Sequence, residues 1–147
     1  MTSVFVDTNI LVRLFAPASP EHARVCQAIS RLEQDQVTLL VGTQVLVELW
    51  VVTTRPTDVN GFGWSAHVAT RCLEAIRQRF GLLHEDATTL DRWLKLVTAV
   101  PILGKRAHDA RIAALMQTHG TTHLLTLNGA DFTGMGVTPV HPDAVAK

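Results

Sequence analysis

The stretch Val4-Phe5-Val6-Asp7-Thr8-Asn9-Ile10-Leu11 decides how the rest of the chain is interpreted. A short run of apolar, β-branched residues ends at Asp7, and residues that commonly begin a helix follow directly. Apolar strands of this kind are typical of parallel sheets, and open α/β sheets place their functional groups beyond the C-terminal ends of such strands. We therefore expect Asp7 at the mouth of a buried strand, with Thr8 or Asn9 capping a helix that begins at Ile10.

Helical and strand patterns alternate along the remainder of the chain. We expect helices over residues 10–15, 20–32, 44–52, 65–80, 90–97 and 109–119, and strands over 37–41, 82–84, 121–127 and 137–140. Ser19 is the expected N-cap of the second helix, with Pro20 at its first position. The alternation predicts an α/β fold with a central, mostly parallel sheet flanked by helices. Because no linker or repeat interrupts the pattern, residues 1–147 are expected to form a single domain.

The segment 44–52 is the ambiguous part of this pattern. Its many β-branched residues favour a strand. Its length, a cap at Thr43 and its position after a predicted strand favour a buried helix, which is the interpretation we adopt. Residues 55–64 contain Pro56, Asn60 and two glycines, and we expect a loop there.

The composition excludes several classes of protein. Hydrophobic residues make up 47% of the 147-residue chain and charged residues 18%, as in a compact folded protein. No segment approaches the roughly 20 apolar residues that a membrane span requires, and no signal-peptide pattern is present, so we expect a cytoplasmic protein. Thirteen basic and 13 acidic side chains cancel, which argues against binding nucleic acid through bulk positive charge. Cys26 and Cys72 fit no metal or redox spacing and are expected to be small buried hydrophobes.

Four acids fall at corresponding positions of the predicted fold. Asp7 ends the first strand, Glu48 follows the second, Asp109 opens the helix before the next long strand, and Asp131 follows that strand. Because the C-terminal ends of parallel strands share one edge of a sheet, these acids are expected to converge. Clustered carboxylates raise one another's pKa unless a cation neutralises them, and Mg²⁺ or Mn²⁺ prefers oxygen ligands. Each acid alone could equally be a solvated or capping residue, so their joint placement carries the prediction.

This pattern is typical of metal-assisted hydrolysis of phosphodiesters, in which the metal activates a bound water. His108, His119 and His123 do not offer a zinc site, because their predicted positions give them no reason to converge. No glycine-rich phosphate loop is present. A haloacid-dehalogenase-like phosphatase also begins with an Asp at the end of strand one, but that chemistry needs a second Asp two residues later, where this chain has Asn9.

Four segments resemble the PIN-domain ribonucleases, and more narrowly the VapC toxins of bacterial toxin–antitoxin pairs. They contain the motifs Asp7-Thr8-Asn9, Val47-Glu48, His108-Asp109-Ala110 and Thr126-Leu127-Asn128 with Asp131-Phe132. The resemblance spans nearly the whole chain and implies a three-layer α/β sandwich, a Mg²⁺ or Mn²⁺ site and RNA cleavage. It also implies homodimerisation and neutralisation by a small antitoxin protein.

Residue by residue, the resemblance implies that Asp7, Glu48 and Asp109 are catalytic, metal-binding acids. Many relatives have an acid where this chain has Asn128, and we expect Asp131 to serve as the fourth acid, directly or through water. The remaining assignments are supporting roles for Thr8, Asn9, Thr126 and Asn128, and RNA contacts by Lys105, Arg106 and Arg13, with Arg55 as a further candidate.

Two other functions remain open from the sequence. One is a non-catalytic PIN-like module that binds RNA or a partner, although a scaffold gains nothing from clustered charge. The other is the haloacid-dehalogenase-like phosphatase, against which Asn9 speaks.

Overall fold

Five parallel strands in the order β3-β2-β1-β4-β5 form the central sheet of the computed structural model, which describes residues 1–145. The strands are β1 (Ser3–Val6), β2 (Thr38–Gly42), β3 (Gly81–Leu83), β4 (His123–Leu125) and β5 (Thr138–Val140). The helices are α1 (Thr8–Leu14), α2 (His22–Gln34), α3 (Thr43–Thr54), α4 (Ala66–Arg79), α5 (Thr89–Ala99), α6 (Arg106–Thr118) and α7 (Pro142–Val145), with short 3₁₀ turns η1 (Thr57–Val59) and η2 (Gly129–Phe132). The predicted α/β fold with a parallel sheet is confirmed.

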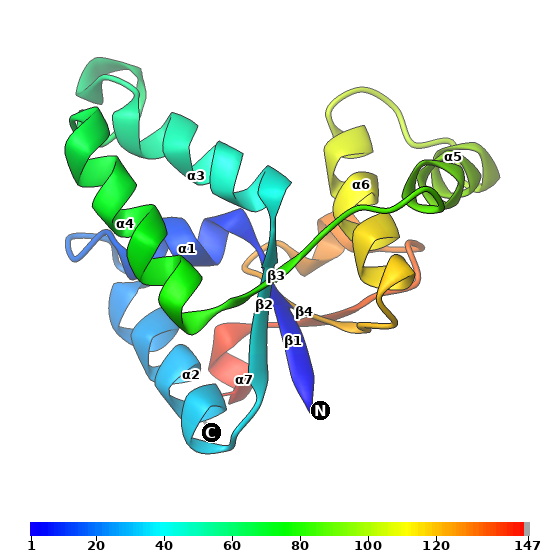
Figure 1. Cartoon of the computed structure of the whole chain (residues 1–147), viewed down its shortest axis with the longest axis horizontal. Helices are drawn as coiled ribbons and strands as arrows, with labels where there is room; N and C mark the ends of the chain where they lie inside the picture. Colours follow the sequence, from blue (N-terminus) through cyan, green and yellow to red (C-terminus); the bar gives the residue numbers. More distant parts are fainter. Residues whose placement is uncertain (146–147) are drawn as a thin grey trace.

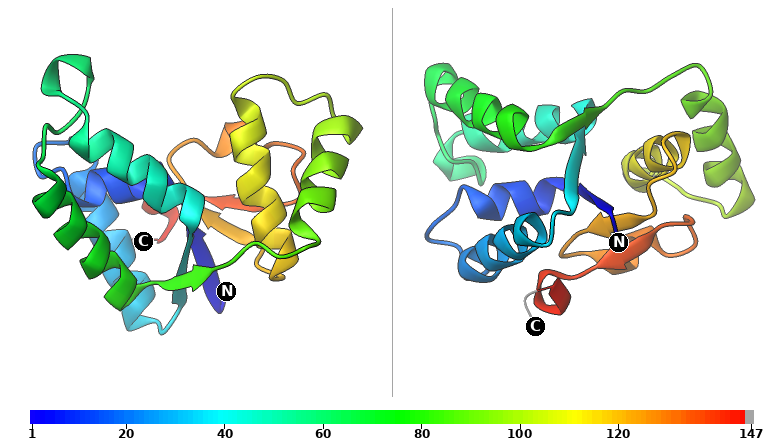
Figure 2. Two further views of the ribbon diagram at one scale, coloured as in Figure 1. Left: turned by 45° about the horizontal axis from the view of Figure 1, so that its top comes forward. Right: turned by 60° about the horizontal axis from the view of Figure 1, so that its bottom comes forward.

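The direction of the chain reverses at β1, and this reversal creates the two helical layers. From β1 the chain passes outward through β2 to β3, and then returns to β4 on the other side of β1. Because parallel crossovers are right-handed, reversing direction places the later helices on the opposite face of the sheet. Figures 1 and 2 accordingly show α1 to α4 on one side of the strands and α5 with α6 on the other. Ligands of open α/β sheets bind at such a reversal point.

The central strand β1 is apolar because helices cover both of its faces. Val4, Phe5 and Val6 are fully buried, and Phe5 pairs with Leu40 of β2 and Leu124 of β4. Buried side chains of α1, α2, α3, α4 and α6 complete the same core. Asp7 follows directly, so the core fixes where the first carboxylate lies.

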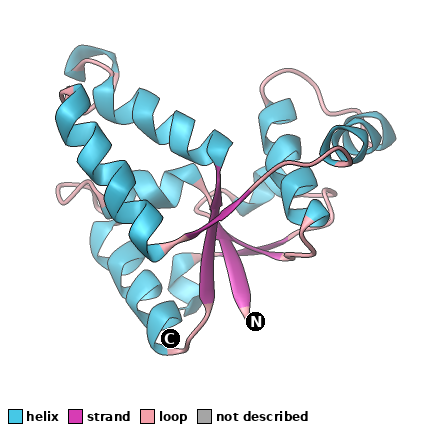
Figure 3. Cartoon of the chain, in the orientation of Figure 1, coloured by secondary structure: helices cyan, strands magenta, loops and turns pink. Residues whose placement is uncertain are grey.

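The ambiguous segment 44–52 is helical, within α3 (Figure 3). Val45, Leu49 and Thr53 face the core, whereas Val47 and Val51 are exposed. A segment joining two parallel strands must cross over the sheet, usually as a helix, and this requirement outweighs the strand propensity of valine. The predicted cap at Thr43 was wrong, because Gly42 occupies the N-cap position.

Other boundaries also differ from the prediction. Helix α1 begins at Thr8, and Asp7 itself is its N-cap, because the Asp7 carboxylate accepts from the Thr8 N–H. Helix α2 begins at His22, since Ser19 joins a turn in which the His22 N–H donates to its carbonyl. Strand β4 covers three residues of the predicted 121–127.

Smaller expectations had mixed outcomes. Residues 55–64 form the predicted loop around η1, and α7 lies where a tail was expected. Cys72 is buried, whereas Cys26 is half-buried with its Sγ 3.5 Å from His22 Nε2. Within residues 1–145, no helix has the length and apolar character needed to cross a membrane. The predicted single domain ends at residue 147, and its last two residues lie outside the described part of the chain.

Candidate active site

Asp7 lies at the C-terminal end of β1 and is buried, with 7% of its surface exposed. Its Oδ1 accepts the Thr8 N–H at 2.8 Å, and its Oδ2 accepts from Thr126 Oγ1 at 2.8 Å and Asn9 Nδ2 at 3.2 Å. Burial raises the pKa of Asp7, the hydrogen bonds from Thr126 and Thr8 oppose that rise, and the nearby charges of Glu48 and Asp131 add to it. The carboxylate is therefore held rigidly although its ionised form is disfavoured.

Asn9 and Thr126 connect the end of β1 to the end of β4. The Asn9 amide donates to Thr126 Oγ1 at 3.1 Å, and its Oδ1 accepts the Leu127 N–H at 3.1 Å. Thr126 Oγ1 also accepts the Asn128 N–H at 3.1 Å. These bonds hold the loop after β4 against the start of α1, and they are consistent with the supporting roles predicted for Asn9 and Thr126.

Glu48 is positioned by its own helix and by α1. Thr8 Oγ1 donates to Glu48 Oε2 at 2.6 Å, and Gln44 Nε2 donates to Glu48 Oε1 at 2.9 Å. The same Gln44 nitrogen lies 2.9 Å from the carbonyl oxygen of His108, so it also connects α3 to α6. Sequence reasoning did not assign Gln44 to the site, although its position one helical turn before Glu48 was a usable signal.

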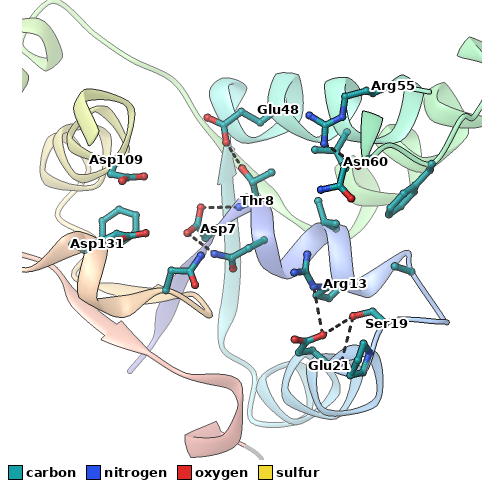
Figure 4. A pocket seen from close by; sticks show the side chains of 18 residues that line it. Asp7, Thr8, Arg13, Ser19, Glu21, Glu48, Arg55, Asn60, Asp109 and Asp131 are labelled. Atoms are coloured by element: carbon teal, nitrogen blue, oxygen red, sulfur yellow. Dashed lines mark hydrogen bonds and ion pairs between the residues drawn. The ribbon is translucent and has the colours of Figure 1, made fainter. Parts of the chain in front are cut away.

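Asp109 and Asp131 face Glu48 and Asp7 from the opposite side of one pocket (Figure 4). Asp109 is in the first turn of α6, as predicted, and Asp131 is in η2. Burial, with the charges of Asp7, Asp131 and Glu48 and against the opposing charge of Arg106, raises the pKa of Asp109 to about 6. The four predicted acids therefore lie near enough to one another to interact electrostatically.

The pocket has a volume of about 670 Å³ and is lined by all four acids, and also by Thr8, Asn9 and Asn128. Within residues 1–145, no three acidic, histidine or cysteine side chains are grouped closely enough to hold a metal ion as they stand. The metal-binding and catalytic roles of these residues therefore stay predictions. The donors are carboxylate and amide oxygens, which suit a hard divalent cation. Burial is the main cause of the raised pKa values of Asp7 and Asp109, and the neighbouring carboxylates add to it through a repulsion that such a cation would relieve.

The predicted substrate-binding residues lie at different places. Arg13 lines the pocket and lies 3.7 Å from Glu21, measured from Nε to Oε2. Lys105 and Arg106 are exposed at the start of α6 and are not among the pocket-lining residues, although Arg106 Nη2 donates to the Asp131 carbonyl at 3.2 Å.

Sequence reasoning missed Glu21, Asn60 and Phe62 as pocket residues, because the segments that carry them reach the pocket only in the folded chain.

The three histidines considered as a zinc site are engaged elsewhere. His119 Nε2 lies 2.6 Å from the His84 carbonyl oxygen, and His123 Nδ1 lies 3.1 Å from Thr122 Oγ1. His108 is exposed in the first turn of α6. In the described part of the chain these side chains form no cluster that could hold a metal.

Comparisons with known proteins agree with this architecture. A sequence model of the PIN domain matches residues 4–136. The ribonuclease VapC24 of Mycobacterium tuberculosis (strain ATCC 25618 / H37Rv) is 28% identical over 135 residues, which is 92% of each chain.

Solved structures share the fold at lower identity. The DNA-bound VapBC from Salmonella typhimurium superposes with a TM-score of 0.72 at 14% identity, covering 97% of this chain and 99% of that one. The sarcin-ricin-loop-cleaving toxin VapC20 of Mycobacterium tuberculosis superposes with a TM-score of 0.64 at 22% identity, covering 93% and 98%. The chain belongs to the PIN domain family and is distantly related to the VapC ribonucleases.

Proposed function

We propose that the protein is a Mg²⁺-dependent endoribonuclease and the toxin component of a VapBC-type toxin–antitoxin pair. The observation that carries the proposal is the convergence of Asp7, Glu48, Asp109 and Asp131, from four separate segments, on one pocket at the reversal point of the sheet. Membership of the PIN domain family, and a relative of matching length that is a ribonuclease, support the same activity.

Asp7 and Asp109 would hold the cation, with Glu48 and Asp131 completing the site directly or through water. When bound, Mg²⁺ or Mn²⁺ would lower the pKa of a water molecule and stabilise negative charge on the phosphate. Asp109 must give up its proton to act as a ligand, so its raised pKa makes cation binding weaker at acid pH.

The remaining residues keep the carboxylates in place. Thr126 and Asn9 fix Asp7 Oδ2. Thr8 and Gln44 occupy one Glu48 oxygen each and fix the orientation of that carboxylate. Hydrogen bonds of this kind limit the reorganisation that a site must undergo when the transition state forms. Asn128 lines the pocket beside them and would support Asp131.

RNA contacts are proposed for Arg13, Lys105 and Arg106, because phosphate groups pair with basic side chains. The small number of these basic residues agrees with the formal net charge of zero, since the bound metal cation would supply the positive charge near the scissile phosphate. A small antitoxin protein and a second copy of the chain are the proposed partners. Solved relatives include a toxin–antitoxin complex from Klebsiella pneumoniae. A toxin acting on cellular RNA would work in the cytoplasm.

Phosphatase chemistry of the haloacid-dehalogenase type has no support at this site. It needs an acid two residues after Asp7, and the Asn9 amide found there is already bonded to Asp7, Thr126 and Leu127.

The decisive experiment is digestion of total RNA by the purified protein, with Mg²⁺ or Mn²⁺ supplied or chelated. We expect metal-dependent cleavage that falls at least about 100-fold in Asp7→Asn, because losing even an indirect partner of a metal ligand costs about 10- to 100-fold. Asp58→Asn is the matched control, since Asp58 is exposed and outside the pocket. Cleavage that persists in Asp7→Asn would overturn the proposal. No cleavage and no stabilisation by Mn²⁺ would favour the non-catalytic module.

A further inference from the structure

The pocket extends beyond the four acids into a second region of opposite charge. We call this region the arginine arm and define it by Arg13, Glu21, Arg55, Asn60 and Phe62. Figure 4 shows Arg55 and Asn60 on one wall and Arg13 with Glu21 on the other, all on the side of the pocket away from Asp109 and Asp131. Two guanidinium groups and one carboxylate leave this region positive, whereas the other end of the pocket carries four carboxylates.

Arg55 is held in position by the loop that follows α3. Its Nη2 donates to the Asn60 carbonyl at 2.9 Å, and its own carbonyl accepts the Gly63 N–H at 2.9 Å. Asn60 has a left-handed backbone with φ 69°, and a Cβ on Gly61 would lie 1.9 Å from the Arg55 carbonyl oxygen. These close backbone contacts restrict the conformation of the loop around Arg55 and so fix the direction of the Arg55 side chain.

The Arg55 guanidinium retains donors that the protein does not use. Among the described residues, Nη1 has no hydrogen-bond partner and is not buried, so it is open to a ligand, whereas Nε is unpaired but buried. Within residues 1–145, the guanidinium makes one hydrogen bond, from Nη2 to the Asn60 carbonyl oxygen. A positioned guanidinium with free donors on a pocket wall matches a phosphate group, which accepts two parallel hydrogen bonds from arginine.

Arg13 adds a second cation that is loosely paired. Its Nε lies 3.7 Å from Glu21 Oε2, which exceeds hydrogen-bond distance, and that oxygen already accepts from Ser19 Oγ at 2.7 Å. The hydrogen bond from Ser19 lowers the pKa of Glu21, which therefore stays ionised and cancels one of the two positive charges. One net positive charge remains to attract a phosphate.

Phe62 supplies an aromatic surface in the same region. Its ring packs edge-to-face against Trp64 at a centroid distance of 5.2 Å, and its backbone N–H donates to the Val52 carbonyl. Val52 and Phe62 both line the pocket. An aromatic ring beside positioned arginines is the combination that holds an unpaired nucleotide, with the base against the ring and the phosphate on the guanidinium.

Resting on the proposed ribonuclease function, we propose that the arginine arm binds the nucleotide adjacent to the scissile phosphate of a single-stranded RNA. Arg55, aided by Arg13, contacts the phosphate of that nucleotide, and Phe62 contacts its base. A pocket of about 670 Å³ lies in the range that encloses small ligands, so it fits extruded nucleotides and not a duplex. Arg55 and Phe62 would then determine strand preference and affinity, while the four acids perform the cleavage.

The test measures binding and cleavage separately. Binding of a 5′-fluorescein-labelled single-stranded oligoribonucleotide is followed by anisotropy in the Asp7→Asn background with Mg²⁺, over a series of salt concentrations. Arg55→Gln should raise Kd about tenfold, as expected for one lost charge-assisted contact. It should also lower the slope of log K against log salt by about 0.7, the value for one phosphate contact on a single strand.

Further variants separate phosphate binding from stacking and from folding. Phe62→Leu should raise Kd about tenfold with the salt slope unchanged, because base stacking involves no counterion release. Arg55→Lys keeps the charge and should retain the slope, with affinity between wild type and Arg55→Gln. Arg71→Gln is the matched control, since Arg71 is exposed on α4 and outside the pocket. Thermal unfolding checks that each variant is folded.

The outcomes distinguish this inference from the function on which it rests. If the wild type cleaves RNA and Asp7→Asn does not, while Arg55→Gln matches Arg71→Gln in Kd and salt slope, the arginine arm is refuted and the nuclease stands. If the wild type does not cleave RNA with Mg²⁺, both proposals fail. Equal affinity for duplex and single strands would also refute the arm, because only an unpaired base reaches the Phe62 ring.

Discussion

Replacing Asp109 by asparagine should stabilise the metal-free protein, although it removes a proposed metal ligand. Burial, together with Asp7, Asp131 and Glu48, raises the pKa of Asp109 from 3.8 to about 6. Because the folded state favours protonated Asp109, the associated stability is complete below about pH 4 and is lost as the pH rises through about 6. At pH 8 the wild type therefore carries an unfavourable charge that Asp109→Asn lacks.

The size of the effect follows from the pKa and from exposure. A rise from 3.8 to about 6 corresponds to at most about 3 kcal/mol, at about 1.4 kcal/mol per pH unit. Asp109 is half-buried, and solvent screening reduces the expected gain in the free energy of unfolding to about 1 kcal/mol. For a chain of this length that gain corresponds to about 3 °C in Tm.

Thermal unfolding at pH 4 and pH 8, with EDTA or with Mn²⁺, checks this reasoning. Without metal, Asp109→Asn should have the higher Tm at pH 8 and the same Tm as the wild type at pH 4. With Mn²⁺ the order should reverse, because the cation stabilises the wild type by binding its folded state. Asp58→Asn, at an exposed acid outside the pocket, should change neither value. A metal-free Asp109→Asn protein that is no more stable than the wild type at pH 8 would refute the proposed electrostatic strain.

Two further substitutions test the scaffold of the site. Thr126→Val removes the hydroxyl bonded to Asp7, Asn9 and the Asn128 N–H, and should cost about 1–3 kcal/mol in chemical denaturation. It should also move the acid limb of the cleavage pH profile to higher pH, because Thr126 lowers the pKa of Asp7; an unchanged profile would contradict this role. Gly61→Ala places a Cβ 1.9 Å from a carbonyl oxygen and should weaken oligoribonucleotide binding through displacement of the loop. Gly104→Ala strains a backbone with positive φ although nothing lies within 4 Å of the added Cβ, so it controls for a general loss of stability away from the loop. Equal binding by these two variants would show that the loop does not position the arm.

Local sequence information was sufficient for most of the helices and strands and for the edge of the sheet at which the four acids lie. A continuous apolar run ending at Asp7 and alternating periodicities predicted a parallel α/β sheet with acids at its C-terminal edge, and the structure has this arrangement. Boundaries were less certain where a side chain had alternative partners. The Ser19 hydroxyl donates to Glu21 instead of capping α2, and Gly42 takes the place expected for Thr43.

The sequence alone predicted the fold class and the edge of the sheet at which Asp7, Glu48, Asp109 and Asp131 lie, because hydrophobic period and residue type are local properties of the chain. Only the tertiary structure decided which partners hold those acids. The Asn9–Thr126 bond joins residues 117 positions apart in the sequence, and the Thr8–Glu48 bond joins residues 40 positions apart. It also decided that Arg55 and Phe62 share a pocket with Asp7. Such contacts depend on how the crossovers bring loops together at the reversal of the sheet, and no local pattern encodes that geometry.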